Sequence, residues 1–423
     1  IMRTLSLGDR GTLVFYLQLA LHRAGQEVSL DGRFGEETCQ ALGAFLDQFQ
    51  GECKVDDSVW MKLLPYLKGY TEYTVKPGDT FWKIAEQFKI AAVNLQLANP
   101  DLQERFLPVG EVIRVPYDFP LVPTQVPYSS QLVAWLVEGL HVRYPFIRYE
   151  QAGQSVLGKS LWVLRIGQGR KQVFYNTSFH ANEWINTPML FRFLEEYGES
   201  LVSGRSLYGH SAGRLFAAYE LFCMPLVNPD GMDLVNETLD DEEAFAAAEQ
   251  IAANYPKIPF PNGWKANIEG IDLNLQFPAG WERAREIKYA AGFISPAPRD
   301  YVGMFPLEAP ESRAVYAYTI NHNFLLILAY HTQGEVIYWK YLDYEPYRSR
   351  EIAGYFGAVS GYAVEETPSQ SGYAGYKDWF IQNYDRPGYT IETGTGVNPL
   401  PLNQFPQIYE DNIQILIGGM TQI

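Results

Sequence analysis

The sequence has few cysteines and no long apolar run. Its 423 residues include 3 cysteines, Cys39, Cys53 and Cys223, which form no Cys-x-x-Cys pair, so neither a disulfide scaffold nor a thiolate zinc site is predicted. A Cys39–Cys53 bridge is possible, but buried free thiols are commoner and are expected here. No apolar run approaches the roughly 20 residues that a membrane-spanning helix needs, so no membrane span is expected.

Positive charge is also scarce. The chain carries 33 lysines and arginines against 49 aspartates and glutamates, a net charge of −16, so no nucleic-acid partner is predicted. The first six residues lack the charged-then-apolar pattern of a secretory signal, although such a signal could have been removed already. The length exceeds one ordinary hydrophobic core, so we expect two or three domains.

Three potential zinc ligands follow strand-like apolar runs. His180 and Glu183 lie beyond the run at 171–178, and His331 closes the run at 324–330. Two imidazoles and one carboxylate suit a catalytic zinc, which keeps its fourth position for water and lowers the pKa of that water to about 7. Glu392 ends another strand-like run, and its carboxylate could take a proton from that water. A hydrolase with one Zn²⁺ per chain is therefore the first hypothesis.

These residues resemble the zinc carboxypeptidase family. The sequence contains no His-Glu-x-x-His, which excludes a thermolysin-like site. The resemblance covers most of residues 124–423 and rests on the following stretches: Ser178-Phe179-His180-Ala181-Asn182-Glu183-Trp184, Asn228-Pro229-Asp230-Gly231, Gly270-Ile271-Asp272-Leu273-Asn274, Tyr301-x-Gly303 before Ala309-Pro310-Glu311, His331-Thr332, and Asp378-Trp379 before Thr390-Ile391-Glu392. It implies that His180, Glu183 and His331 bind zinc. It also implies that Glu392 is the general base and later the acid toward the leaving amine.

The catalytic region is predicted to be α/β. Apolar runs alternate with helical patterns, which predicts a mixed sheet covered by helices on both faces. Thr187 is expected to be the N-cap and Pro188 the first residue of a helix that reaches Tyr197, and Pro310-Glu311 is expected to start a helix that ends near Phe324. The predicted strands are residues 161–166, 173–179, 220–227, 325–331 and 389–392.

The resemblance also suggests further site residues. The family places an arginine after a tryptophan, matched by Trp264-Lys265, so Lys265 is the candidate cation for the charge that develops on the carbonyl oxygen; a solvated surface lysine is the alternative. Lys377 precedes the pair Asp378-Trp379 and is predicted at the floor of the specificity pocket, where a cation suits an acidic group such as the second carboxylate of diaminopimelate. An exposed loop lysine is the alternative there too. Tyr373 and Tyr376 lie near the place of the family's mobile tyrosine, in a Gly-rich segment.

The main departure from the family lies at Asn274-Leu275. Carboxypeptidases of the family use Asn-Arg here to grip a free terminal carboxylate, and only Asn274 matches. An isobutyl group cannot make the paired, charge-assisted bonds of an arginine. The sequence therefore predicts an open primed side, although Arg283, Arg285 or Arg299 could compensate.

Two modules are predicted before the catalytic domain. Residues 1–67 resemble a peptidoglycan-binding-like helical bundle, with one helix from Val14 stopped by Gly25 and another from Glu37 to Phe49; a packing domain without a ligand is the alternative. A connector with four prolines, residues 116–127, is expected to be extended and semi-rigid. It leads into a catalytic domain at 124–423.

Residues 70–117 resemble a LysM module. A βααβ order is expected, in which Thr80 caps a helix that runs to Phe88 and residues 112–115 form the closing strand. LysM modules bind N-acetylglucosamine glycans, and a vestigial spacer is the alternative. The matching stretches are Tyr73-Thr74-Val75-Lys76-Pro77-Gly78-Asp79-Thr80-Phe81-Trp82-Lys83-Ile84-Ala85, Asn94-Leu95-x-x-Ala98-Asn99-Pro100 and Leu107-Pro108-Val109-Gly110-Glu111-Val112-Ile113-Arg114-Val115-Pro116.

These features together resemble the bacterial γ-D-glutamyl-L-diamino acid endopeptidases. The resemblance implies cleavage between D-glutamate and diaminopimelate or lysine in the stem peptides of peptidoglycan, with wall glycan as a second partner. It implies a location in the cell wall or outside the cell, or in the cytoplasm of a sporulating cell. A carboxypeptidase acting on free C-termini and a non-catalytic glycan-binding protein are the alternatives.

Overall fold

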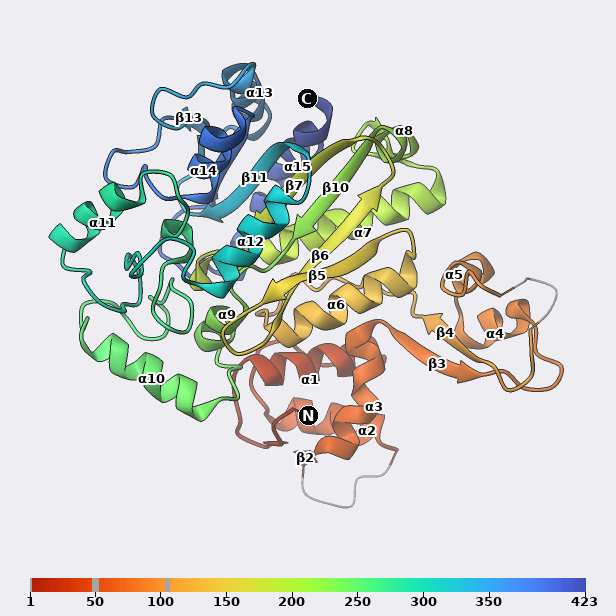
Figure 1. Ribbon diagram of the computed structural model, residues 1–423. Helices are drawn as coiled ribbons and strands as arrows, with labels where there is room; N and C mark the ends of the chain where they lie inside the picture. The colour runs from red at the N-terminus through yellow and green to blue at the C-terminus, as the bar shows by residue number, and fades with distance from the viewer. Residues whose placement is uncertain (1, 48–52, 103–106) are drawn as a thin grey trace. The chain divides into compact units, whose positions relative to one another are not determined.

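The computed structural model describes residues 2–47, 53–102 and 107–423 (Figure 1). By their internal contacts the residues form two compact units, Ile1–Pro127 with Gln131–Arg148, and Tyr128–Ser130 with Tyr149–Ile423. Most of helix α6 (Ser130–Arg143) therefore groups with the N-terminal modules. The boundaries expected from the sequence, at residues 67, 70, 117 and 124, stay predictions.

The N-terminal helical region holds α1 (Thr12–Arg23), α2 (Glu36–Phe45) and α3 (Asp57–Lys68), with a small pair of strands, β1 (Leu5–Ser6) and β2 (Lys54–Val55). The first helix ends before Gly25, as predicted. The second was expected to reach Phe49, but it ends at Phe45, and Phe49 lies outside the described residues. The third helix was not predicted from the sequence.

The expectation of free thiols is wrong for two of the three cysteines. Cys39 and Cys53 form a disulfide with Cα atoms 5.8 Å apart. This bridge links α2 to the segment before β2 in the N-terminal region. Cys223 is a buried free thiol, as expected.

The predicted βααβ order is confirmed by β3 (Tyr70–Thr74), α4 (Phe81–Phe88), α5 (Ala92–Leu97) and β4 (Val112–Pro116). Thr80 caps α4, because its side chain accepts a hydrogen bond from the backbone N–H of Lys83 at 3.2 Å. The two strands pair antiparallel. A small apolar core that includes Ile84, Leu95 and Ile113 lies between the helices and the strands.

The connector at 116–127 packs against its own unit. Leu121 and Val126 are buried. The carbonyl oxygens of Leu121 and Phe119 accept hydrogen bonds from Arg23 at 2.6 Å and from Arg143 at 2.8 Å. The proline-containing connector is therefore held within this unit by buried side chains and by hydrogen bonds to its carbonyl oxygens.

The larger unit is built on a sheet of eight strands in the order β13-β12-β14-β11-β7-β10-β6-β5 (Figure 1). Four central strands run parallel, while β6 and β12 run antiparallel to their inner neighbours, which confirms the predicted mixed sheet. The strands are β5 (Arg148–Gln154), β6 (Ser160–Gly167), β7 (Lys171–Thr177), β10 (Tyr219–Met224), β11 (Phe324–Thr332), β12 (Val336–Tyr338), β13 (Ala363–Glu365) and β14 (Gly388–Thr393). Each of the five predicted strands is present. The sequence missed β5, β12 and β13, which are polar or only three residues long.

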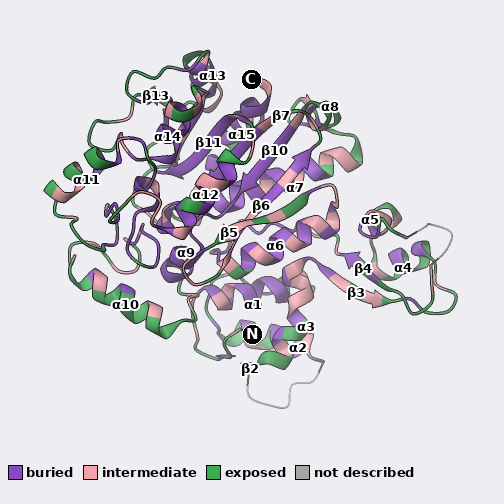
Figure 2. Cartoon of the chain, viewed as in Figure 1, coloured by how far each residue is buried: buried purple, intermediate pink, exposed green. Residues whose placement is uncertain are grey.

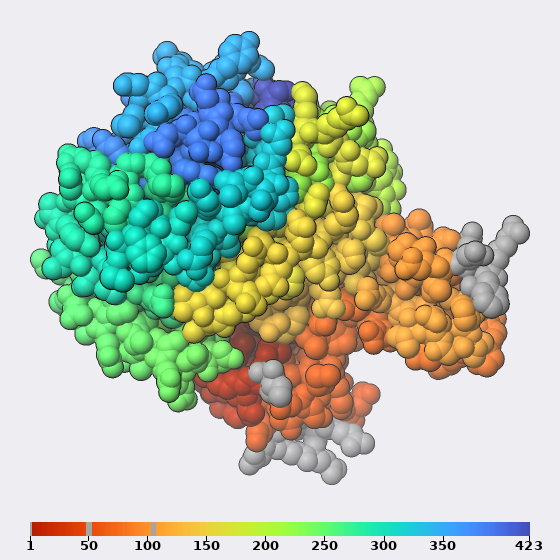
Figure 3. All heavy atoms as spheres, viewed as in Figure 1, coloured from red at the N-terminus to blue at the C-terminus, as the bar shows by residue number. Residues whose placement is uncertain are grey.

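Helices cover both faces of this sheet. Side chains alternate along a strand, so Phe174 packs against Tyr318 of α12 (Pro310–Ile320), while Tyr175 on the opposite face donates a hydrogen bond to the carbonyl oxygen of Leu416 in α15 (Phe405–Thr421). Helix α14 (Tyr376–Tyr384) contacts β11 and β14, and α7 (Asn186–Ser203) packs on α15. Most residues of the central strands are buried (Figure 2). On the face turned to the viewer, α12 and the loops around it cover much of the sheet (Figure 3).

Helix α7 differs in detail from its prediction. It begins at Asn186, so Thr187 lies inside the helix and is not its N-cap. The Thr187 hydroxyl is buried and donates to the carbonyl oxygen of Pro225 at 2.6 Å.

The remaining elements are η1 (Ala181–Glu183), β8 (Ser206–Leu207), β9 (His210–Ser211), α8 (Ala212–Ala218), α9 (Pro229–Val235), α10 (Glu242–Ala253), η2 (Leu273–Leu275), α11 (Trp281–Ala290), α13 (Ser349–Ser360) and η3 (Leu402–Gln404). Among the described residues, we find no helix with the length and apolar character needed to cross a membrane.

Candidate metal centre and substrate cleft

Four polar side chains gather at one edge of the sheet, where three neighbouring parallel strands end. His180 and Glu183 follow β7, and the short helix η1 carries Glu183. His331 and Glu392 lie near the ends of β11 and β14, where they are directly paired in the register of the two strands. The carboxyl ends of parallel strands share one edge of a sheet, so residues far apart in the sequence meet there.

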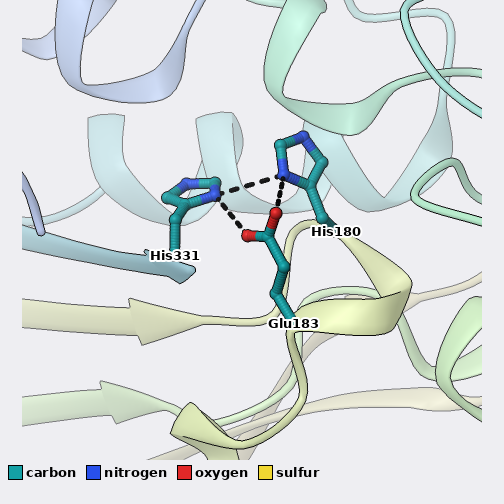
Figure 4. Close-up of side chains that lie close together, drawn as sticks. All are labelled: His180, Glu183 and His331. Atoms are coloured by element: carbon teal, nitrogen blue, oxygen red, sulfur yellow. Dashed lines mark hydrogen bonds and ion pairs between the residues drawn. The ribbon is translucent and has the colours of Figure 1, made fainter. Parts of the chain in front are cut away.

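The donor atoms of His180, Glu183 and His331 point toward one another (Figure 4). Nδ1 of His180 lies 3.0 Å from Oε1 of Glu183, and Nδ1 of His331 lies 3.0 Å from Oε2 of Glu183. The two Nδ1 atoms are 3.3 Å apart. A tetrahedral zinc with ligand atoms about 2.0–2.1 Å away separates those atoms by about 3.3–3.4 Å, so these residues fit a zinc ion.

Residues behind the donors hold them in place. Nε2 of His180 lies 3.0 Å from Oδ1 of Asp272, and the backbone N–H of Thr332 donates to Oε2 of Glu183 at 3.2 Å. The side-chain amide of Asn186 donates to the carbonyl oxygen of His331 at 2.9 Å. A carboxylate behind a ligand histidine fixes the orientation of its ring and raises its basicity. Asp272 lies in a motif that the sequence singled out, but its contact with His180 was not predicted.

The charges around the three donors favour the ionised form of Glu183. Burial works against the charged form of Glu183, but Lys265 and His180 hold its pKa well below the usual range. Burial similarly opposes charge on His180, yet Glu183 and Asp272 raise its pKa to about 9. Burial lowers the pKa of His331. The centre is therefore a buried cluster in which carboxylates and cations stabilise one another.

Lys265 lies inside the cleft. Its Nζ is 2.6 Å from Oε1 of Glu183, and its side chain is 17% exposed, so the alternative of a solvated surface lysine is wrong. Glu392 lines the same space. Burial, together with the charge of Glu183, raises the pKa of Glu392 to about 8. A cation and a carboxyl group thus face the space beside the three donors.

Two cavities meet at this centre. One of about 220 Å³ extends toward Asn274, Leu275 and Lys377. The other, of about 870 Å³, extends toward other loops that contribute several amide side chains. Both are lined by the same four residues: Lys265, Arg299, Tyr338 and Glu392. The cleft therefore continues in two directions from the metal-ligand set.

The predicted substrate residues have different environments. Asn274 and Lys377 line the smaller cavity. The ammonium of Lys377, however, donates hydrogen bonds to the carbonyl oxygen of Lys340 at 2.7 Å and to Thr367 Oγ1 at 3.2 Å, and it forms an ion pair with Asp378 Oδ1 at 2.7 Å. The charge of Lys377 is therefore already paired with a carboxylate of the protein, so the expected unpaired cation for an acidic substrate group is not found at this residue.

The two tyrosines are poor candidates for the mobile tyrosine. The Tyr376 side chain is fully buried, and its hydroxyl lies 2.9 Å from Thr319 Oγ1. The Tyr373 ring is half-buried and packs against Tyr341. Of the described residues, Tyr338 is the tyrosine that lines the two cavities. The sequence analysis missed it because it lies on β12, a strand of three residues without a recognisable pattern.

Of the three arginines considered as substitutes at position 275, Arg299 is the one placed in the cleft. Arg283 pairs with Glu286 at 2.8 Å on the surface, and the Arg285 guanidinium lies over the ring of Trp281. Arg299 lines both cavities, and Lys288 lines the smaller one.

Comparison with known proteins identifies the family. The zinc carboxypeptidase family model matches residues 133–415. The chain belongs to the zinc carboxypeptidase family. It is therefore a metallopeptidase, and the family implies zinc for the His-Glu-His group. The LysM domain model matches residues 73–116 of this family member.

The relatives include a bacterial endopeptidase. This peptidase is 41% identical over 398 residues to "Gamma-D-glutamyl-L-diamino acid endopeptidase 1" of Lysinibacillus sphaericus, covering 82% of this chain and 98% of the relative. It is 42% identical over 279 residues to the uncharacterized protein YqgT of Bacillus subtilis (strain 168), covering 64% of this chain and 72% of that protein. The crystal structure of carboxypeptidase A from Helicoverpa armigera has the same fold, with a TM-score of 0.52 and 17% identity, covering 79% of this chain and 80% of that one. The predicted fold class and family are confirmed.

Proposed function

We propose that this metallopeptidase hydrolyses the γ-D-glutamyl–diamino acid bond in peptidoglycan stem peptides. The observation that carries the proposal is the shape of the cleft: it extends in two directions from the centre, and Leu275 lines the smaller cavity. A substrate with residues on both sides of the scissile bond suits such a cleft. Action on an internal bond is therefore favoured over trimming of a free C-terminus.

Leu275 is the main argument against a conventional carboxypeptidase. It is buried among apolar neighbours that include Trp281 and Val302. A free terminal carboxylate placed against Leu275 would lose part of its hydration without gaining the paired hydrogen bonds that an arginine at this position would give. The intact set of three donors also argues against a lapsed, purely glycan-binding protein.

His180, Glu183 and His331 would hold the zinc ion. Zinc bound in this way activates water for attack and polarises the carbonyl group of the substrate. Glu392, which lines both cavities beside the three donors, would accept a proton from the attacking water and pass it to the leaving amine. Lys265 would stabilise the negative charge that develops on the carbonyl oxygen.

The substrate is inferred from similarity and from the modules. The relative in Lysinibacillus sphaericus carries the γ-D-glutamyl-L-diamino acid endopeptidase name and matches this chain over 98% of its own length. The LysM module supports attachment to wall glycan, and the N-terminal helical region is assigned the same role. These features favour action in the cell wall or outside the cell, with the cytoplasm of a sporulating cell as the alternative setting.

Mass spectrometry of purified muropeptides after incubation with the zinc-loaded protein tests the proposal. Cleavage at the proposed bond releases the fragment that begins with diaminopimelate or lysine and leaves D-glutamate at the end of the other fragment. The Glu392→Gln variant is the matched control, because it keeps the size of the side chain. Stepwise loss of C-terminal residues by the wild type, without cleavage after D-glutamate, would establish a carboxypeptidase in its place.

A further inference from the structure

The backbone on both sides of Arg299 is hydrogen-bonded, on one side to the segment that carries Lys265 and on the other to Asp272, which contacts His180. The carbonyl oxygen of Pro298 accepts hydrogen bonds from the backbone N–H groups of Lys265 at 2.7 Å and Ala266 at 2.9 Å. On the other side, the backbone N–H of Asp300 donates to Oδ2 of Asp272 at 3.1 Å. These hydrogen bonds fix the backbone on both sides of Arg299, and its side chain lines both cavities.

One edge of the Arg299 guanidinium is already fixed. Its Nε donates to Oδ2 of Asp300 at 2.6 Å, while Lys288 Nζ donates to Oδ1 of the same carboxylate at 2.5 Å. Within the described parts of the chain, neither terminal nitrogen of Arg299 has a protein acceptor. These two nitrogens form the planar fork that binds a carboxylate through two parallel hydrogen bonds. Arg299 is thus oriented by the protein and still free to bind a ligand.

The other cations of the cleft are less suited to that role. Lys265 is held against Glu183 at 2.6 Å, Lys288 is held by Asp300, and Lys377 is ion-paired with Asp378 at 2.7 Å. A single ammonium also lacks the planar geometry that matches two carboxylate oxygens. Arg299 is therefore the group in the cleft best prepared to bind a carboxylate.

The proposed substrate presents such a carboxylate close to the scissile bond. When D-glutamate is linked through its γ-carbonyl, its α-carboxylate stays free. Four carbon–carbon bonds separate the carboxylate carbon from the scissile carbonyl carbon, which is roughly 5 Å in an extended chain. Arg299 lines both cavities beside Lys265 and Glu392, so it lies in the region that this group would reach.

We propose that Arg299 binds the free α-carboxylate of the glutamyl residue and so selects an acidic residue on the acyl side of the scissile bond. This inference rests on the proposed function and names its specificity-determining residue. A competing role follows from the nearness of Lys265: Arg299 could instead stabilise charge on the scissile carbonyl oxygen. That charge develops with every substrate, whereas the α-carboxylate can be removed from the substrate.

Two synthetic peptides distinguish these roles. Both contain L-alanyl-γ-D-glutamyl-diaminopimelate, and they differ only in a free or an amidated α-carboxyl group on the glutamyl residue. The zinc-loaded wild type should favour the free carboxylate by about 10- to 100-fold in kcat/KM, since charge-assisted bonds are lost with the amide. Arg299→Gln should reduce this ratio to within about threefold, mainly by slowing the acidic peptide. Arg299→Lys should give an intermediate ratio.

Arg283→Gln is the matched control, because Arg283 pairs with Glu286 on the surface; its ratio should equal that of the wild type. Equal loss of activity on both peptides in Arg299→Gln would overturn the inference and assign Arg299 to the carbonyl oxygen. A wild-type ratio near one would also overturn it while leaving the proposed function intact. If Arg299→Gln fails to fold, the inference is tested by the ratio of kcat/KM values for the two peptides in the wild type and in Arg299→Lys. A ratio in Arg299→Lys equal to that of the wild type would contradict the inference. A wild type that cuts neither peptide at the γ-bond would refute the proposed function, and this inference with it.

Discussion

The metal side of the cleft and its substrate side are built from different parts of the fold. His331 and Glu392 lie on neighbouring parallel strands, and His180 and Glu183 come directly after a third. The substrate side is formed by loops and short elements such as η2, which carries Leu275. Backbone pairing of the parallel strands therefore brings the candidate metal ligands to one edge of the sheet.

The difference extends to how each side is supported. Asp272 connects the two, because one of its carboxylate oxygens lies 3.0 Å from His180 and the other accepts the backbone N–H of Asp300 at 3.1 Å. Asp300 in turn orients Arg299. A change on the metal side should therefore abolish hydrolysis of every substrate, while a change on the substrate side should alter the choice between substrates.

The largest effect is expected from His180→Ala. Loss of one of three ligands should strip the zinc and lower kcat/KM at least about a thousandfold on all peptides. Elemental analysis of the purified variant checks the metal content. His210→Ala, a histidine outside the site, is the control and should keep its zinc. Stoichiometric zinc in His180→Ala would contradict the ligand assignment.

Glu392→Gln separates metal binding from proton transfer on the same side of the cleft. The variant should keep its zinc and lose at least about a hundredfold in kcat, because an amide cannot accept the proton of the attacking water. Metal analysis and steady-state kinetics on one peptide measure the two properties. Turnover close to that of the wild type would exclude the role of general base.

Asp272→Asn tests the connection between the two sides. Without the carboxylate behind His180, zinc affinity should fall by about 10- to 100-fold. Competition with a chelator measures this affinity. Asp343→Asn, a change at an exposed position, should leave it unaltered. Unchanged zinc affinity in Asp272→Asn would show that His180 needs no such support.

Leu275→Arg should change substrate choice and leave the metal side intact. An arginine here restores the family's grip on a terminal carboxylate and should raise cleavage of an α-linked peptide with a free C-terminus by about tenfold. Leu275→Met keeps the apolar character and serves as the control. Rates on α-linked and γ-linked peptides measure the change. A folded, zinc-loaded Leu275→Arg variant with no gain would show that position 275 does not decide between the two modes.

The smallest effect is expected outside the cleft, in the LysM module. Trp82 is 65% exposed, and exposed aromatic rings suit stacking against sugars. Trp82→Ala should reduce the rate on insoluble wall material by about threefold and leave the rate on soluble stem peptides unchanged, since tethering acts only on wall-bound substrate. Equal loss on both materials would show that Trp82 acts through the peptidase itself.

The sequence alone predicted the fold class, the family and the four polar residues that the structure brings together at one edge of the sheet. Strand-end histidines and carboxylates can be recognised in a sequence because apolar runs mark the strands, and parallel strands end at one edge. The LysM module was equally readable, since its turns, its Thr80 cap and its closing strand are encoded by neighbouring residues. Local order along the chain was sufficient for these features.

Only the tertiary structure decided the substrate side. It placed Arg299 and Tyr338 in the cleft, paired Lys377 with Asp378, buried Tyr376 and joined Cys39 to Cys53. Most of these outcomes depend on contacts between residues that are distant in the sequence. The periodicity of apolar residues along the chain does not predict such contacts. A side chain's availability to a ligand is set by the partners that the fold brings to it, which is why the metal centre could be read from the sequence and the specificity of the cleft could not.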